Sequence, residues 1–127
     1  MTALVMGASG FLGSHVTRQL ARRGDDVRVL LRRTSDTRGI DGLDVERCYG
    51  DLFDDDGLRA AMTDVDVLYY CVVDARAWLR DPGALFSTNV EGLRRVLDMA
   101  LATGIEKFVF TSTVGTLAAG TDRPVTE

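Results

Sequence analysis

The sequence predicts an α/β fold, a doubly wound parallel sheet in a single domain of residues 1–127, and three observations support this prediction. Five short apolar runs are spaced along the chain, segments with helical periodicity separate them, and the first run ends directly in a glycine-rich turn. Strands with Val and Leu at successive positions are typical of a parallel sheet that helices cover on both faces. Right-handed crossovers then favour the strand order 3-2-1-4-5.

The expected strands are the five apolar runs, at residues 2–6, 27–31, 45–49, 65–73 and 107–111. Residues 10–23 are expected to form a helix, because Leu12, Val16 and Leu20 recur at every fourth position and share one face. Residues 35–44 are rich in Asp, Gly, Ser and Thr without periodicity, which predicts a loop.

Two further helices are expected in the second half of the chain. Residues 54–62 begin with three aspartates, whose carboxylates favour the positive end of a helix dipole. Adjacent aspartates on a helix point in different directions, so this is not expected to be a metal site. The longest helix is expected to begin at Asp81 and Pro82 and to end near Thr103. Its apolar residues, expected to face inward, are Leu85, Val90, Val96, Leu97 and Leu101.

Composition and charge exclude several classes of protein. The net charge is −4, from 19 acidic and 15 basic residues, so no nucleic-acid partner is expected. The apolar runs are shorter than the roughly 18 residues of a membrane span, so no membrane partner is expected either. Cys48 and Cys71 lie in apolar runs and are expected to be small, buried free thiols, and no metal site is expected. These features indicate a cytoplasmic protein, in which His15, the only histidine, is structural.

The glycine-rich turn between the first strand and the first helix is the strongest functional signal. Its residues, all expected to contact a cofactor, are Gly7, Ala8, Ser9, Gly10, Phe11, Leu12 and Gly13. A Rossmann-type dinucleotide site needs glycine for a tight turn, for close approach of the backbone to a pyrophosphate, and for close packing of the helix on the sheet. The unpaired amides of the first helical turn and the helix dipole then hold the phosphates. A sharp turn alone would need only one glycine.

Four motifs in order along the chain resemble the extended short-chain dehydrogenase/reductases, within the NAD-dependent epimerase/dehydratase superfamily. They are the glycine turn, Gly50-Asp51-Leu52, Thr88-Asn89-Val90-Glu91-Gly92, and FVFTSTVGTL at residues 108–117. Trp78, Asp81 and Pro82 add a resemblance to the branch of dihydroflavonol reductases, hydroxysteroid dehydrogenases and hopanoid-associated sugar epimerases. The resemblance covers nearly the whole chain. It implies the N-terminal, cofactor-binding part of such a protein, without the last strands and the substrate region.

The end of the second strand favours NADP over NAD, which is the second choice. An acid at this point would accept hydrogen bonds from both ribose hydroxyls of NAD, but the chain has Arg32 and Arg33 there instead. A carboxylate would repel a 2′-phosphate, whereas a guanidinium binds it with charge-assisted hydrogen bonds. Arg32 is the expected primary contact and Arg33 the helper. The alternative is that both arginines are solvated residues that end a strand.

The resemblance implies roles for residues after the third and fourth strands. In the relatives, the residue that matches Asp51 accepts from the adenine amino group, and the residue that matches Leu52 packs on the ring. A turn-making Asp is the alternative on local grounds. Small residues usually line the cofactor after the fourth strand, where this chain has Cys71, Val72 and Val73, so a narrower wall is expected.

Asn89 matches the asparagine to which the family gives a structural and proton-relay role near the cofactor. Asparagine is unfavourable in the middle of a helix, which favours a role beyond helix formation.

The family's chemistry moves a hydride between nicotinamide and a carbinol carbon, while a tyrosine transfers the proton. A lysine four residues later lowers the tyrosine pKa, which is near ~10 when unassisted. The resemblance places the substrate-orienting hydroxyl on Thr113, with Ser112 as the alternative. None of the three tyrosines, Tyr49, Tyr69 and Tyr70, has a lysine four residues later, because the only lysine is Lys107. The family's Tyr-x-x-x-Lys pair is expected beyond residue 127.

Two functions remain open from the sequence. The first is the NADP(H)-binding half of a reductase, dehydrogenase or epimerase that acts on a carbonyl or secondary alcohol of a sugar, flavonoid or steroid-like small molecule. The second is a non-catalytic dinucleotide-binding module with a redox-sensing or regulatory role. In either case the fifth strand is expected to present an apolar edge and to promote self-association. Whether the protein forms a homodimer stays open.

Overall fold

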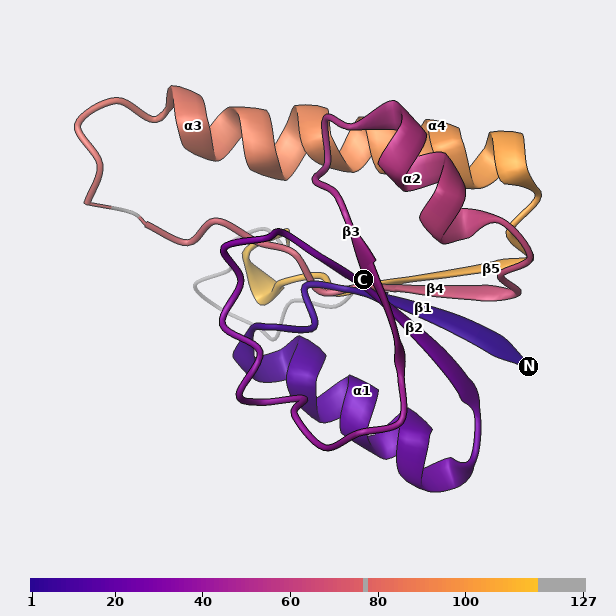
Figure 1. The fold of residues 1–127 in the computed structure, drawn as a ribbon. Coiled ribbons are helices and arrows are strands. Elements are labelled where there is room, and N and C mark those ends of the chain that lie inside the picture. The colour runs from indigo at the N-terminus through magenta and orange to yellow at the C-terminus, as the bar shows by residue number, and fades with distance from the viewer. Residues whose placement is uncertain (77, 117–127) are drawn as a thin grey trace, which may run out of the picture.

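The computed structural model describes residues 1–76 and 78–116, and its centre is a five-stranded parallel sheet (Figure 1). The strands are β1 (Thr2–Met6), β2 (Asp26–Leu31), β3 (Glu46–Tyr49), β4 (Val67–Tyr70) and β5 (Lys107–Phe110). Their order is β3-β2-β1-β4-β5, and every neighbouring pair is parallel. The predicted fold class and strand order are confirmed.

Helices cover both faces of the sheet. Figure 1 shows α1 (Phe11–Arg23) on one face, and α2 (Asp55–Met62) and α4 (Leu93–Thr103) on the other. The helix that ends in α4 starts as α3 (Gly83–Phe86) and passes through a π-helical segment, η1 (Ser87–Gly92). A short 3₁₀ turn, η2 (Val114–Thr116), follows β5. Each face of the sheet therefore has its own hydrophobic core.

A carboxylate caps the start of α2, and glycines cap the ends of α1 and α4. The Asp54 carboxylate accepts a hydrogen bond from the Gly57 amide at the start of α2. Gly24 and Gly104 end α1 and α4 in the left-handed conformation, with φ of 85° and 76°. The first turn of α1 is different, because its cap, Gly10, has no side chain to bond the free amides.

The fourth strand is shorter than predicted. Residues 65–73 were expected to be extended in the sheet, but the ladder covers only Val67–Tyr70. Its neighbour β1 ends at Met6, opposite Tyr70, because the chain turns sharply at Gly7. The Cys71 amide still donates to the Met6 carbonyl, and after that the chain leaves the sheet.

The longest helix buries a narrower face than predicted. Val96 is fully buried as expected, but Val90 is 38%, Leu97 40% and Leu101 82% exposed. The buried stripe continues instead through Met99 and Ala100. The predicted set combined apolar residues of two helix faces, whereas only one face contacts the sheet and α2, and the other remains exposed in the described chain.

Candidate functional site

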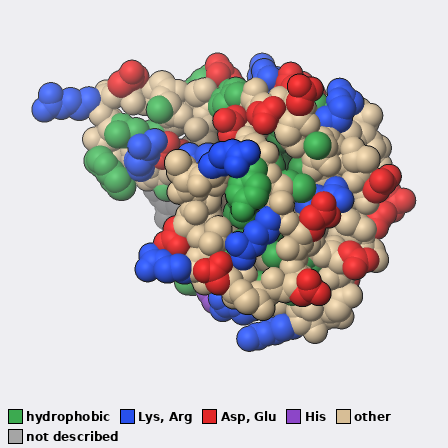
Figure 2. Space-filling view, in the orientation of Figure 1, with side chains coloured by type: hydrophobic (Ala, Val, Ile, Leu, Met, Phe, Trp, Pro, Cys, Tyr) green, Lys and Arg blue, Asp and Glu red, His purple; other side chains and the backbone are tan. Residues whose placement is uncertain are grey.

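The carboxyl ends of β1 to β4 lie on the left of the sheet in Figure 1, and they border a cavity of about 390 Å³. Figure 2 shows the molecule hollowed on this side. Nine residues that the sequence predicts for the site line this cavity: Gly7, Ser9, Gly10, Arg32, Asp51, Leu52, Cys71, Val72 and Val73. Ser35, Phe53 and Thr88 also line it, although none of the three was predicted as a site residue.

The glycine turn leaves backbone amides open at the cavity. Gly7 has a φ of +83°, and a Cβ there would lie 2.7 Å from the Cys71 carbonyl oxygen. The Gly10 amide donates to the Gly7 carbonyl at 3.0 Å, which closes the turn. The amides of the next three residues have no partner within the helix, as at any helix start. The positive end of α1 therefore borders the cavity, where an anion would be stabilised.

Gly13 has a packing role. A Cβ at Gly13 would lie 2.0 Å from the Gly7 carbonyl oxygen, so α1 can approach β1 this closely only with glycine at this position. Ala8 is buried in the core below the turn, while Phe11 and Leu12 are exposed on the first turn of α1. These three residues can therefore contribute backbone groups to a ligand, whereas their side chains lie outside the cavity lining.

At the end of β2, a closed turn presents Arg32 to the cavity. The Ser35 amide donates to the Arg32 carbonyl at 2.9 Å, and the Ser35 hydroxyl accepts from the Arg32 amide at 3.1 Å. Arg33 does not line the cavity, and its guanidinium carbon lies 5.5 Å from the centre of the Tyr49 ring. The two predicted arginines therefore have different surroundings.

The loop between β3 and α2 forms a second wall. The Asp51 carboxylate accepts from the Phe53 amide at 2.7 Å, as a turn-making Asp would, which leaves its other oxygen for a ligand. Leu52 packs against Gly92 of η1, where a Cβ would lie 2.7 Å from the Leu52 Cδ1 atom. An apolar residue directly after Asp51 and Leu52 was the signal that could have identified Phe53.

Arg95 of α4 supports this loop from behind. Its guanidinium bonds the Asp55 carboxylate at 2.6 Å and lies 5.6 Å from the centre of the Phe53 ring. The loop between β3 and α2 is thus held by α4 as well as by its own turn.

The segment after β4, residues 71–73, forms a third wall of the cavity, and Asn89 holds it in place. Its side-chain oxygen accepts from the Asp74 amide and its side-chain nitrogen donates to the Asp74 carbonyl, both at 2.8 Å. Asp74 directly follows Val72 and Val73, so this pair of bonds fixes the position of the third wall. The Val73 side chain in this wall is 71% exposed. The Arg76 guanidinium beside Asp74 lowers the pKa of that carboxyl. Asn89 itself lies behind the cavity lining, while its neighbour Thr88 reaches the cavity.

Ser112 and Thr113 follow β5 and are exposed, outside the cavity lining. The Thr113 hydroxyl accepts from the Gly115 amide at 3.2 Å. Lys107 lies at the opposite, amino end of β5, far along the strand from these hydroxyls. Burial raises the pKa of Tyr70 to about 12, which makes it a poor proton donor near neutrality. Leu117, the last residue of the predicted motif, lies outside the described residues.

The cysteines and acidic residues do not form a metal centre in the described chain. No group of three or more His, Cys, Asp and Glu side chains in the described ranges could hold a metal ion. Cys48 and Cys71 are free thiols, as expected, but both are only partly buried and not buried as the sequence predicted. Burial raises the pKa of both thiols. Both thiols are therefore neutral at neutral pH.

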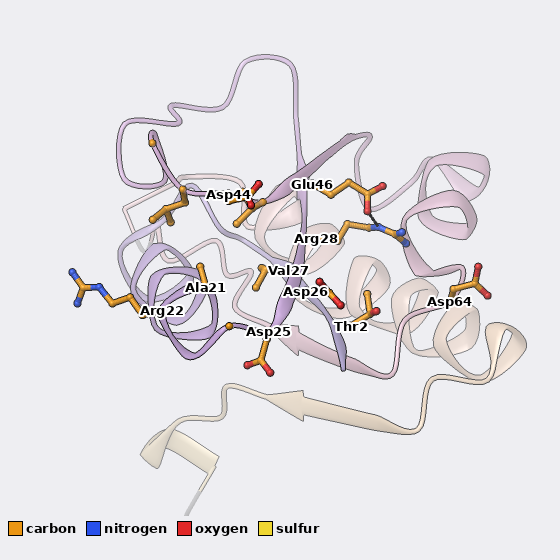
Figure 3. Close-up of a pocket in the computed structure, with 14 residues that line it drawn as sticks. Thr2, Ala21, Arg22, Asp25, Asp26, Val27, Arg28, Asp44, Glu46 and Asp64 are labelled. Carbon is orange, nitrogen blue, oxygen red and sulfur yellow. Dashed lines mark hydrogen bonds and ion pairs between the residues drawn. The ribbon is translucent and has the colours of Figure 1, made fainter.

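The amino edge of the sheet has a larger cavity, of about 670 Å³ (Figure 3). Its charged lining is mainly acidic, with Asp25, Asp26, Asp44, Glu46 and Asp64. Figure 3 shows Arg28 next to Glu46, and the Arg28 Nε–Glu46 Oε2 distance is 2.8 Å. Arg28 also donates to the carbonyls of Ala61 and Thr63 at the end of α2. This cavity therefore surrounds a structural hydrogen-bond network.

Surface charge is mixed on the face that Figure 2 shows. Lys and Arg side chains alternate with Asp and Glu, and no large patch of one sign is visible. Within the ranges that the structure describes, no helix is both long and apolar enough to cross a membrane.

Comparison with known proteins identifies the family. Residues 3–127 match the NAD dependent epimerase/dehydratase family. The chain belongs to this family. Its members are NAD(P)-dependent oxidoreductases and epimerases, and solved structures of relatives hold NAD.

Among relatives, the chain is 42% identical over 115 residues to sterol demethylase protein B of Methylococcus capsulatus, covering 91% of this chain and 35% of that protein. It is 34% identical to a putative dihydroflavonol 4-reductase of Synechocystis, covering 93% and 34%. The crystal structure of gox2253 superposes with a TM-score of 0.87 at 41% identity, covering 95% of this chain and 37% of that one. The chain thus spans about a third of the length of the relatives it matches.

Proposed function

We propose that this chain binds NADP(H) across the carboxyl edge of its sheet. The observation that carries the proposal is the open first turn of α1, where the Gly7, Gly10 and Gly13 turn presents unpaired amides to the cavity. The pyrophosphate would bind at these amides, because an anion there is stabilised by the helix dipole and by direct hydrogen bonds. The adenine would lie beside Asp51 and Leu52, and the nicotinamide toward Cys71, Val72 and Val73.

The preference for NADP over NAD depends on the turn after β2. Arg32 lines the cavity at the place where the adenosine ribose would bind, and Ser35 offers a hydroxyl beside it. The nearest acid in the turn, Asp36, is paired with Arg38, which lowers the pKa of Asp36 to about 2. A 2′-phosphate would therefore meet a guanidinium with no carboxylate competing for it at the strand end.

For the whole protein, we propose hydride transfer between the nicotinamide and a carbonyl or secondary alcohol of a small molecule. Relatives named as sterol-4-alpha-carboxylate 3-dehydrogenase and dihydroflavonol 4-reductase support this class of reaction. The bound cofactor supplies the hydride. Within this chain, the cavity walls hold and orient the cofactor, and the Thr113 hydroxyl, with Ser112 as the alternative, is proposed to orient the substrate oxygen.

The second candidate function is a non-catalytic dinucleotide-binding module. It requires no Tyr-x-x-x-Lys pair, and the 127 residues contain none. The coding sequence that follows the codon for residue 127 distinguishes the two, because an in-frame Tyr-x-x-x-Lys supports the enzyme. We expect the chain by itself to bind the cofactor without turning over an alcohol, and steady-state oxidation by the isolated chain would contradict this.

The experiment that tests the proposal is titration of NADPH fluorescence with the wild type, Gly10→Val and Arg32→Glu. A Cβ at Gly10 would meet only the Gly7 carbonyl oxygen, at 3.4 Å, so this variant should fold. It should lose affinity by about 100-fold, because two or more charge-assisted hydrogen bonds would be lost. Arg32→Glu should weaken NADPH by about 30-fold and leave NADH within about twofold. Equal binding by all three proteins would overturn the cofactor assignment.

A second readout uses the two thiols. Cys71 lines the proposed cofactor cavity and Cys48 does not. Bound NADPH should therefore slow alkylation of Cys71 by iodoacetamide and leave the rate at Cys48 unchanged, as peptide mass spectrometry can measure. Free thiols also support a cytoplasmic location, where cysteines stay reduced.

Self-association is proposed at the free edge of the sheet. Within the part of the chain that the structure describes, β5 pairs with β4 alone, and Phe110 is 50% exposed at its end. An unpaired apolar edge promotes pairing between chains. Light scattering of the isolated chain should show species larger than a monomer at high concentration, and a monomer throughout would count against this.

A further inference from the structure

Tyr49 is an exposed aromatic residue to which neither the family motifs nor the cavity assigns a role. It is the last residue of β3 and is 47% exposed. Its ring centre lies 5.5 Å from the guanidinium carbon of Arg33, a distance at which a cation is attracted to the face of an aromatic ring. Arg33 is thus held by the neighbouring strand.

The Tyr49–Arg33 pair lies next to the proposed ribose site. Leu31, the last residue of β2, is in register with Tyr49 of β3. Arg32 follows Leu31 and lines the cavity, and Gly50 follows Tyr49 and also lines it. The two paired residues are therefore the chain neighbours of two residues of the cavity lining.

The charge of Arg33 is available to an anion. Among the described residues, six arginines form ion pairs with Asp or Glu, and Arg33 is not one of them. An exposed arginine samples many rotamers, and a ligand that binds it must first order the side chain. The Tyr49 ring reduces this cost because it holds the guanidinium in one place before a ligand arrives.

Arg95 and Phe53 form the contrasting pair in the same site. Their guanidinium-to-ring distance is 5.6 Å, almost the same as that of Arg33 and Tyr49. Arg95, however, is also bonded to Asp55, so its charge is neutralised. Phe53 lines the cavity beside Asp51, on the adenine side, where NAD and NADP are identical. This pair provides a matched control.

We propose that Tyr49 is a positioning residue for the 2′-phosphate of NADP: it holds the Arg33 guanidinium in one place while Arg32 approaches from the cavity. The inference rests on the proposed function and adds a specificity determinant to it. The role proposed for Tyr49 affects only the binding of the 2′-phosphate, which NADP has and NAD lacks. Loss of the Tyr49 ring should therefore change the discrimination between two nucleotides without changing the affinity for the part that they share.

Calorimetry with adenosine 2′,5′-bisphosphate and adenosine 5′-monophosphate tests the role on the full chain. Tyr49→Leu should weaken the bisphosphate by about two- to fivefold and leave the monophosphate unchanged. Tyr49→Phe keeps the ring and should retain wild-type affinity for both. Phe53→Leu should weaken both nucleotides by the same factor, because its contact lies on the shared adenine side. The double variant Tyr49→Leu/Arg33→Gln should bind the bisphosphate less than about twofold more weakly than Arg33→Gln alone, because the ring acts through Arg33.

Two results would overturn the role, and they differ from failure of the proposed function. Should Tyr49→Leu leave the ratio of the two affinities unmoved, or should Tyr49→Phe lose discrimination as fully as Tyr49→Leu, the ring does not act through Arg33. Should the wild type bind neither nucleotide, the proposed function fails, and the role of Tyr49 fails with it. Thermal unfolding midpoints of each variant, equal to that of the wild type, show that the fold is intact.

Discussion

The two edges of the sheet differ in a way that cavity size does not reveal. The amino edge holds a cavity of about 670 Å³ and the carboxyl edge one of about 390 Å³, yet the smaller one is the candidate site. At the amino edge, Arg28 bonds Glu46 and the last carbonyls of α2, so the polar groups are paired with one another. At the carboxyl edge, the first amides of α1 have no such partners. Unpaired polar groups, more than volume, indicate where a ligand would bind.

The lining charges separate the two edges further. Five carboxylates and two arginines line the amino edge. The carboxyl edge has Arg32 and Asp51 as its charged side chains, together with the positive end of α1. A dinucleotide carries two or more negative charges, which the amino edge would repel and the carboxyl edge would attract. The parallel sheet adds a general reason, because the strand-to-helix loops and the helix N-termini lie at the carboxyl ends of the strands.

The largest expected effect comes from filling the space under the glycine turn. In Gly13→Ala, the new Cβ would lie 2.0 Å from a backbone oxygen, so α1 must move away from β1. We expect a loss of about 3 kcal/mol or more in the free energy of unfolding. Gly42→Ala, at the amino edge, meets no atom within 4 Å and has only its φ of +76° against it, so it should cost about 1 kcal/mol. Urea unfolding measures both, and equal losses would contradict the packing role.

Replacing Arg28 at the amino edge should lower the stability of the fold and leave nucleotide binding unchanged. Arg28→Met would leave the Ala61 and Thr63 carbonyls without their donor and Glu46 without its partner. We expect a loss of about 2 kcal/mol in the free energy of unfolding. Arg22→Met, at the rim of the same cavity, is the control and should change stability by less than about 0.5 kcal/mol. A change in NADPH affinity for Arg28→Met would show that the two edges are not independent.

Loosening the third wall should have a moderate effect at the carboxyl edge. Asn89→Ala removes both hydrogen bonds to the Asp74 backbone, at a cost of about 1–2 kcal/mol in stability. Faster hydrogen exchange of the Asp74 amide would confirm that the loop is released. Ser87→Ala, in the same π-helical segment, should leave that amide unchanged. Slow exchange in Asn89→Ala would mean that the loop is held by other contacts.

The smallest expected effect is the titration of Asp36. The Arg38 guanidinium lowers the pKa of this carboxyl to about 2, below its ordinary value of 3.8. The ion pair therefore stabilises the fold fully above about pH 4, and its contribution is lost as the pH falls through 2. In Arg38→Gln the pKa of Asp36 should return toward 3.8, as carbon-detected NMR can follow. An unchanged pKa would mean that Arg38 does not hold it.

Much of the site could be predicted from short stretches of sequence. The spacing of Gly7, Gly10 and Gly13 predicted a turn, a close approach and an open helix start, and the structure has each of these. Arg32 was predicted from the absence of an acid at one strand end. Such features depend on a few adjacent residues and on the backbone conformations that glycine allows.

The residues that the sequence missed depend on contacts between distant segments. Phe53 and Thr88 line one cavity although they are far apart in the chain, and neither was predicted as a site residue, although Thr88 opens one of the family motifs. Arg33 was grouped with Arg32, but the adjacent strand holds it through Tyr49 instead. The end of the fourth strand was misplaced because the length of a ladder depends on where its partner strand ends.

By itself, the sequence determined the alternation of strands and helices, the strand order and the position of the glycine turn, because periodicity and turn conformation are set by near neighbours along the chain. Only the tertiary structure decided which side chains line the cavity, that the Tyr49 ring contacts Arg33, and that Asn89 acts through the Asp74 backbone. These properties arise where β2, β3, β4 and η1 come together, and burial and pairing there depend on residues that the chain brings close only when it folds.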